Sequence, residues 1–61
     1  MTLAYRTDKA IALHIRRGVW EVVPLTGYDP SQTTWREFRQ SQKTKLATNR
    51  RAAIRIVKEK R

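Results

Sequence analysis

The sequence predicts a small α+β fold, in which an antiparallel sheet is followed by a C-terminal amphipathic helix. In the first half, "AIALHIR" alternates large apolar residues with other residues at period two, which is typical of a half-buried strand. The last segment, "RRAAIRIVKEKR", instead consists largely of good helix formers. With 61 residues the chain has room for a single domain, residues 1–61, with a small core and a few fraying residues at its end.

The first predicted element is a β-hairpin with strands over about residues 9–16 and 19–25. The second strand is rich in β-branched side chains, which favour a pleated sheet. Arg17-Gly18 lies between the strands, and glycine supplies the positive φ angle that a tight turn needs. An alternative is a helix over residues 8–17, with a threonine as its N-cap and the same glycine after its end.

The two-residue turn also predicts which residues of the hairpin face one another. Pairing Arg16 with Val19 places the large apolar side chains of both strands on one face of the sheet. His14 then lies opposite Glu21 on the other face. This pair has the components of an oriented general base, but a cross-strand polar pair on a solvated face is far more common, and we predict no enzyme activity.

Residues 33–39 are expected to form a third strand, because two threonines open the segment. The alternative is a helix within residues 30–42. Asp29, followed by proline, can cap such a helix, and Trp35 and Phe38 then share one of its faces. The sequence leaves these two interpretations open.

The C-terminal helix is predicted over about residues 48–60, with Thr48 or Asn49 as its cap. At helical spacing, one sector of this region is apolar and is expected to be buried; it comprises Leu46, Ala53, Ile56 and Val57. A second sector is basic and is expected to face outward; it comprises Arg51, Arg55 and Lys58.

Positive charge dominates the composition and is unevenly distributed. The net charge is +9, with four cations against three carboxylates in residues 1–35 and ten against two in residues 36–61. Such asymmetry indicates a polyanionic partner, and we expect nucleic acid, DNA more than RNA. Most of the cations are arginine, whose fork matches phosphate geometry. The candidate nucleic-acid-binding residues are Arg16, Arg17, Arg36, Arg39, Lys43, Lys45, Arg50, Arg51, Arg55 and Lys58.

The sequence offers little other site chemistry. With no cysteine and one histidine, we predict no metal site and no cofactor. No apolar run approaches the ~20 residues of a membrane span and no signal-peptide pattern opens the chain, so we expect a cytoplasmic protein without membrane contact. The small core leaves a homo-oligomer or a protein partner as a further way to bury surface.

The order of the elements resembles a known group of DNA-binding domains. The stretches "IALHIRRGVWEVV", "WREF" and "NRRAAIRIV", which cover most of residues 11–57, are similar in layout to three-stranded-sheet-plus-helix domains. Examples are the arm-type N-terminal domains of phage tyrosine integrases and the AP2-like domains. The chain departs from that layout in the long connection over residues 25–34 and in "RQSQKTKLAT" before the helix. The resemblance implies that the exposed sheet face enters a DNA groove, with the helix packed behind it and touching phosphates. The readers it implies are Arg16, Arg17, Arg36 and His14.

These features together predict a small DNA-binding accessory or regulatory protein of phage or mobile-element type, without catalysis. One alternative is an RNA-binding or ribosome-associated protein, in which Trp35 or Phe38 stacks on unpaired bases. In a chain with so few large apolar residues, however, both aromatics more often belong to the core. A further alternative is a protein-interaction module that uses its basic amphipathic helix.

Overall fold

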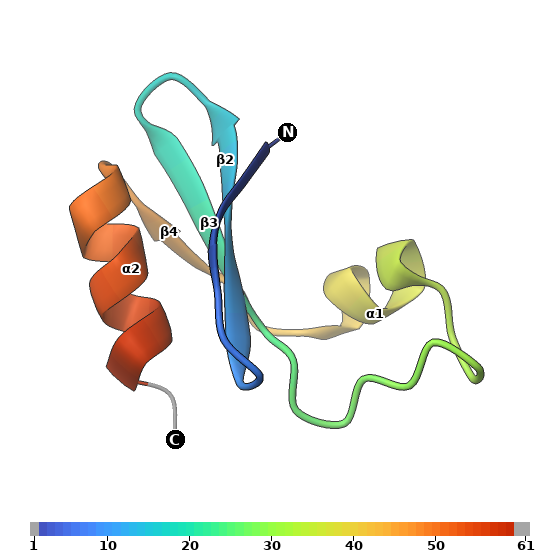
Figure 1. Cartoon of the computed structure of the whole chain (residues 1–61). Coiled ribbons are helices and arrows are strands. Elements are labelled where there is room, and N and C mark those ends of the chain that lie inside the picture. The colour runs from blue at the N-terminus through green and yellow to red at the C-terminus, as the bar shows by residue number, and fades with distance from the viewer. Residues whose placement is uncertain (1, 60–61) are drawn as a thin grey trace.

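The computed structural model describes residues 2–59 and contains a four-stranded antiparallel sheet with helices on its two sides (Figure 1). The sheet order follows the chain, β1-β2-β3-β4. The predicted α+β class, with an antiparallel sheet followed by a C-terminal helix, is confirmed. The elements in chain order are β1 (Thr2–Arg6), β2 (Ala10–Arg16), β3 (Val19–Pro24), α1 (Trp35–Ser41), β4 (Lys45–Ala47) and α2 (Arg50–Glu59).

β2 and β3 form the predicted hairpin, and their bounds lie within one residue of the expected ones. The alternative helix over residues 8–17 is wrong. Gly18 closes the turn with a φ of 77°, a region that residues with a side chain rarely adopt. Glycine at this position therefore permits the tight reversal that joins the two strands.

The register of this hairpin differs from the prediction at one residue. Arg16 does pair with Val19, but Ile15 has no partner, and a bulge shifts the pairing on the N-terminal side. His14 consequently pairs with Trp20 and not with Glu21. Because strand side chains alternate, one inserted residue moves the preceding side chains to the opposite face. The expected grouping of the large apolar residues on one face is therefore wrong.

Two edge strands complete the sheet, and neither was predicted. β1 pairs with β2 through a second bulge near Ala4. β4 lies in the segment "RQSQKTKLAT", expected as a lead into the helix, and pairs with β3. It has only three residues, too few to show a periodic pattern.

Residues 33–39 do not form a third strand; the alternative interpretation, a helix, is right. The cap is Thr34, whose Oγ1 accepts a hydrogen bond from the backbone N–H of Glu37 at 3.2 Å. "TWRE" is thus a capping-box sequence, and its threonine acts through its hydroxyl rather than its β-branching. Asp29 is not the cap: its carboxylate accepts bonds from the Ser31 backbone and hydroxyl in the preceding turn.

α2 packs on one face of the sheet through small side chains. Ala10, Ala12 and Val22 from the sheet and Ala53 and Val57 from the helix are each at most 1% exposed. Alanine has no atoms beyond Cβ, so the helix can lie close to the strands without leaving voids. This seam fixes which side of α2 is turned outward.

The predicted cap of α2 is confirmed at Asn49, whose Oδ1 accepts a hydrogen bond from the Ala52 backbone N–H at 2.8 Å. The apolar positions on the helix itself are buried or half-buried, as expected. Leu46 is the exception: it lies on β4 and is 68% exposed. The predicted helix end at residue 60 and the fraying of the last residues lie outside the described part of the chain.

α1 lies over the opposite face of the sheet, at one end (Figure 1). Leu13 and Val23, both buried, share this face with Glu21, which binds to α1. Phe38 is 6% exposed, and its ring centroid lies 4.7 Å from that of Tyr28. The expectation that this aromatic belongs to the core is confirmed.

Candidate nucleic-acid interface

The cations predicted on the C-terminal helix lie together on its outward side. With Ala53 and Val57 buried against the sheet, all of the helix cations are exposed. We call them the helix stripe: Arg50, Arg51, Arg55 and Lys58. At about 1.5 Å of rise per residue the stripe extends roughly 12 Å along the surface.

The helix stripe is held in place by contacts with β1. Arg50 Nη2 donates a hydrogen bond to the Ala4 carbonyl oxygen at 3.5 Å. The Lys58 ammonium lies 5.8 Å from the centroid of the Tyr5 ring, within range of a cation–π contact. No side-chain carboxylate within residues 2–59 lies within 4.0 Å of a stripe cation. Their charge is therefore not neutralised by a neighbouring Asp or Glu of that part of the chain.

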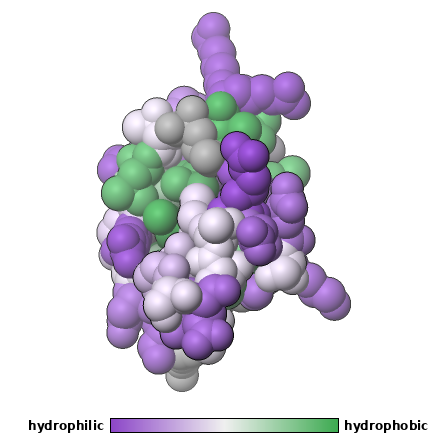
Figure 2. Space-filling view, turned by 90° about the vertical axis from the view of Figure 1, so that its right-hand side faces the viewer, coloured by the Kyte–Doolittle hydropathy of each residue, from purple (hydrophilic) through white to green (hydrophobic). Residues whose placement is uncertain are grey.

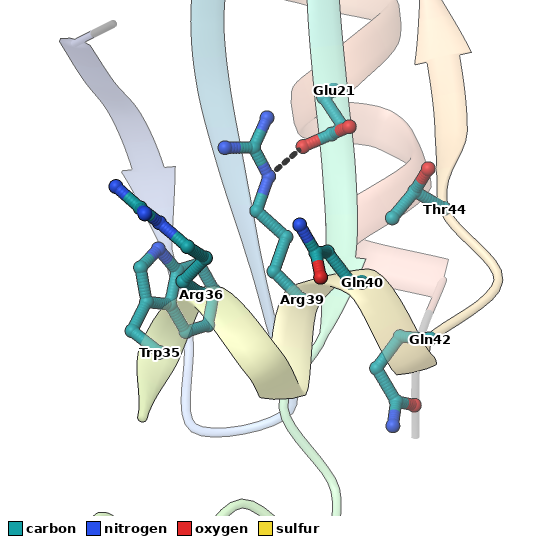
Figure 3. Close-up of a pocket in the computed structure, with 7 residues that line it drawn as sticks. All are labelled: Glu21, Trp35, Arg36, Arg39, Gln40, Gln42 and Thr44. Carbon is teal, nitrogen blue, oxygen red and sulfur yellow. Dashed lines mark hydrogen bonds and ion pairs between the residues drawn. The ribbon is translucent and has the colours of Figure 1, made fainter. Parts of the chain in front are cut away.

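Arg36 and Arg39 lie on the other side of the sheet, on α1. Arg39 Nε donates to Glu21 of β3, and this ion pair ties α1 to the sheet (Figure 3). The two side chains are only 26% and 16% exposed, so the pair is better shielded from solvent than a surface pair. Arg36, one turn earlier, is exposed. The predicted cations of the two helices thus lie on opposite sides of the sheet and do not form one surface.

A hollow opens between α1, β3 and the segment leading to β4 (Figure 3). We call it the α1 hollow; it is lined by Glu21, Trp35, Arg36, Arg39, Gln40, Gln42 and Thr44. Trp35 is half-buried at this position, whereas Phe38 is buried. Arg36 and Arg39 were predicted as binding residues, but Gln40, Gln42 and Thr44 were not, because single amides and hydroxyls leave no periodic signal in a sequence.

Beyond α1, this sheet face is largely apolar, with exposed leucines on its two edge strands. Leu3, Leu13, Glu21 and Leu46 form one row across the four strands. Leu3 is 57% exposed and Leu46 is 68% exposed. Figure 2, which views the molecule from the α1 side, shows hydrophobic groups gathered in its upper half and mostly polar groups below. We call this surface the open sheet face.

The open sheet face lacks the chemistry that base reading in a groove requires. Direct readout depends on polar side chains that bond base edges, and the row just described offers leucines and a carboxylate already engaged by Arg39. Arg16 and Arg17 are exposed at the hairpin end. His14 lies on the opposite face of the sheet, where its ring stacks on that of Trp20 with the centroids 4.4 Å apart. Its Nε2 is buried and has no hydrogen-bond partner within residues 2–59.

The two remaining candidates lie along the β4 edge. Lys43 precedes β4, and Lys45 belongs to it; both are exposed. Lysine on an edge strand discourages pairing with another chain. Lys43 and Lys45 flank Thr44, where the α1 hollow ends, and Lys45 lies between Thr44 and the start of the helix stripe at Arg50, so exposed positive charge continues around this edge.

Other features of the described residues point to no second kind of site. Hydrogen bonds from the Ser31 hydroxyl and backbone lower the pKa of the exposed Asp29 carboxyl, which stabilises a turn. Within residues 2–59 no three His, Asp or Glu side chains gather as metal ligands would. No helix in the same range is long and apolar enough to cross a membrane.

Comparison of the chain with protein-family models, with curated proteins and with solved structures finds no match. The resemblance to integrase-type domains therefore stays a prediction. The fold and the surface define a class in physical terms: an α+β protein with an outward-facing basic helix and a separate polar hollow.

Proposed function

We propose that the chain is a small nucleic-acid-binding protein that uses the helix stripe to hold phosphates and performs no catalysis. The observation that supports this most directly is the stripe itself: its exposed cations lie on a helix fixed by a buried seam, with no carboxylate of residues 2–59 within 4.0 Å. A helix held rigidly keeps the cations in place before the ligand arrives, so less conformational freedom is lost on binding.

The expected ligand is DNA, in keeping with an accessory or regulatory protein of a phage or mobile element. Duplex DNA presents about one negative charge per 1.7 Å of axis, so a stripe of roughly 12 Å can meet several phosphates at once. Such contacts position a protein without reading sequence. RNA offers the same phosphates and is the alternative. The lack of cysteine supports a cytoplasmic location.

The salt dependence of binding tests the proposal. Four phosphate contacts predict a slope of about −3.6 for log K against log[salt], or roughly a 150-fold loss of affinity between 50 and 200 mM salt. We suggest fluorescence anisotropy with a labelled 20-base-pair duplex. If the protein does not bind this duplex at low salt, the proposal that it binds duplex DNA is wrong.

A charge-matched pair of variants locates the interface. Arg51→Gln with Arg55→Gln removes two stripe cations, and the slope should fall by about 1.8. Arg6→Gln with Lys9→Gln removes the same charge from exposed positions outside α2 and should change affinity much less. Equal losses for the two double variants would show that binding depends on net charge rather than on the helix stripe.

The exposed Leu3 and Leu46 favour a second candidate, a protein-interaction module that docks through the open sheet face. The occupant would be a partner protein or a second copy of the chain. Sedimentation of the wild type and of Leu46→Ser separates the two cases, because only self-association would change the mass of the purified protein. A monomer that binds duplex DNA in a salt-dependent manner would favour the first candidate.

A further inference from the structure

We infer that the α1 hollow binds an unpaired nucleobase, so that the preferred ligand is a single-stranded segment. This inference rests on the proposed function, because the helix stripe and its neighbouring cations would hold the same strand by its phosphates. It adds a second site, on the other side of the sheet, that takes a base rather than a phosphate.

Trp35 supplies the stacking surface. Its ring is braced by Tyr28, at 5.6 Å between centroids and 71° between planes, and lies 6.2 Å from Phe38. Since Phe38 is buried, this cluster holds the indole in place while the half-buried Trp35 still lines the hollow. A rigid, partly exposed aromatic ring is the usual platform for unpaired bases, and it accepts any base because every base has a π face.

Polar groups that line the hollow together with Trp35 match the edges of a base. The Gln40 amide provides both a donor and an acceptor, so it can pair with the edge of a purine or a pyrimidine. Figure 3 shows Gln40 and Arg39 on the same side of α1 as Glu21, whereas Gln42 points away from them. Arg39 uses Nε for Glu21, and no bond from its terminal nitrogens is found within residues 2–59. Those nitrogens are donors for a base oxygen.

The cations around the hollow give a strand a route to the helix stripe. Arg36 is exposed at one side of the hollow. At the other side Thr44 leads directly into Lys45 of β4, and three residues after β4 the chain reaches Arg50. A flexible single strand can bend around this short edge with its phosphates near lysine. A duplex is too stiff to do so and has its bases paired.

The decisive comparison uses three ten-nucleotide DNA ligands at the same salt concentration: oligo(dT), an abasic strand of equal length, and a duplex. Oligo(dT) and the abasic strand have the same phosphates, so the ratio of their affinities measures the base. One stacked base predicts binding about 5-fold to 150-fold tighter for oligo(dT). Equal affinities for these two strands would overturn the inference. A chain that binds none of the three at low salt would instead overturn the proposed function. Oligo(rU) in parallel shows which sugar the site prefers.

Two variants assign the base effect to the hollow. Trp35→Leu keeps an apolar side chain in the aromatic cluster but removes the flat ring, and it should bring the oligo(dT) to abasic ratio close to 1. Gln40→Glu places a negative charge in the hollow. Its control, Gln32→Glu, makes the same change at an exposed residue that does not line it. Gln40→Glu should lower the ratio and Gln32→Glu should leave it unchanged. If both glutamate variants keep the wild-type ratio, the base binds elsewhere, and this result decides the matter even if Trp35→Leu fails to fold.

Discussion

Replacing Val57 by alanine tests whether the buried seam under α2 holds the helix stripe in place. Val57 is fully buried and belongs to the cluster that joins α2 to the sheet. The change removes two carbons, worth about 0.8 kcal/mol each, and leaves a cavity between rigid elements, so we expect a total loss of about 2 kcal/mol. A domain of this size has a free energy of unfolding of about 3–9 kcal/mol. The loss is therefore a large fraction of the total.

Thermal unfolding followed by circular dichroism measures this loss. For a domain of about 60 residues, 2 kcal/mol corresponds to a fall in Tm of roughly 8–16 °C. The control is Ile54→Ala on the same helix, where the side chain is half-buried among the stripe cations. It removes three carbons, one more than Val57→Ala, yet we expect a loss of about 1 kcal/mol or less because little of that surface leaves water. A smaller Tm shift for Val57→Ala than for Ile54→Ala would refute the packing described here.

Three further predictions concern local structure. Thr34→Ala should cost about 1 kcal/mol in unfolding experiments through loss of the α1 cap, whereas Thr33→Ala next to it should cost less. Gly18→Ala should cost about 1 kcal/mol, since the turn needs a positive φ and no neighbouring atom would clash with a methyl group. Hydrogen bonds from Ser31 lower the pKa of the Asp29 carboxyl below its ordinary value of 3.8. The ionised carboxylate therefore stabilises the fold above pH 3.8, and this contribution is lost as the pH falls through the lowered pKa. Acid unfolding of Asp29→Ala should lack this component, and an unchanged pH profile would show that the turn contributes nothing.

The sequence predicted the elements whose signal repeats along the chain. The hairpin over 10–24 and the helix over 50–59 each extend over several periods of their pattern. Gly18 marks the turn of the hairpin, and Asn49 marks the start of the helix. β4 could not be found in this way, because three residues contain no full pattern. The bulge at Ile15 could not be predicted either. Alternation of apolar and other residues indicates a strand, but it cannot show that one residue of the strand lacks a partner.

The α1 segment shows a different limit. Thr34 favours a strand by its side-chain shape and a helix start by its hydroxyl, and only the cap bond to Glu37 decides between them. Of the candidate site, the helix stripe followed from helical spacing. The α1 hollow did not, because it joins Glu21 to residues 35–44, and such a contact depends on the sheet register that the bulge changes.

The path of the chain explains why most of the positive charge does not form one patch. Residues 36–59 begin on α1 on one side of the sheet, pass through the sheet edge as β4, and end on α2 on the other side. The cations of α1 and of α2 are therefore separated by the thickness of the sheet, and only Lys43 and Lys45 at the edge lie between them. A straight duplex can lie against one side at a time, and the α2 side has more cations that no nearby carboxylate neutralises. A ligand that uses both sides has to bend sharply around β4. That requirement, more than the net charge, is the reason to compare single strands with duplexes first.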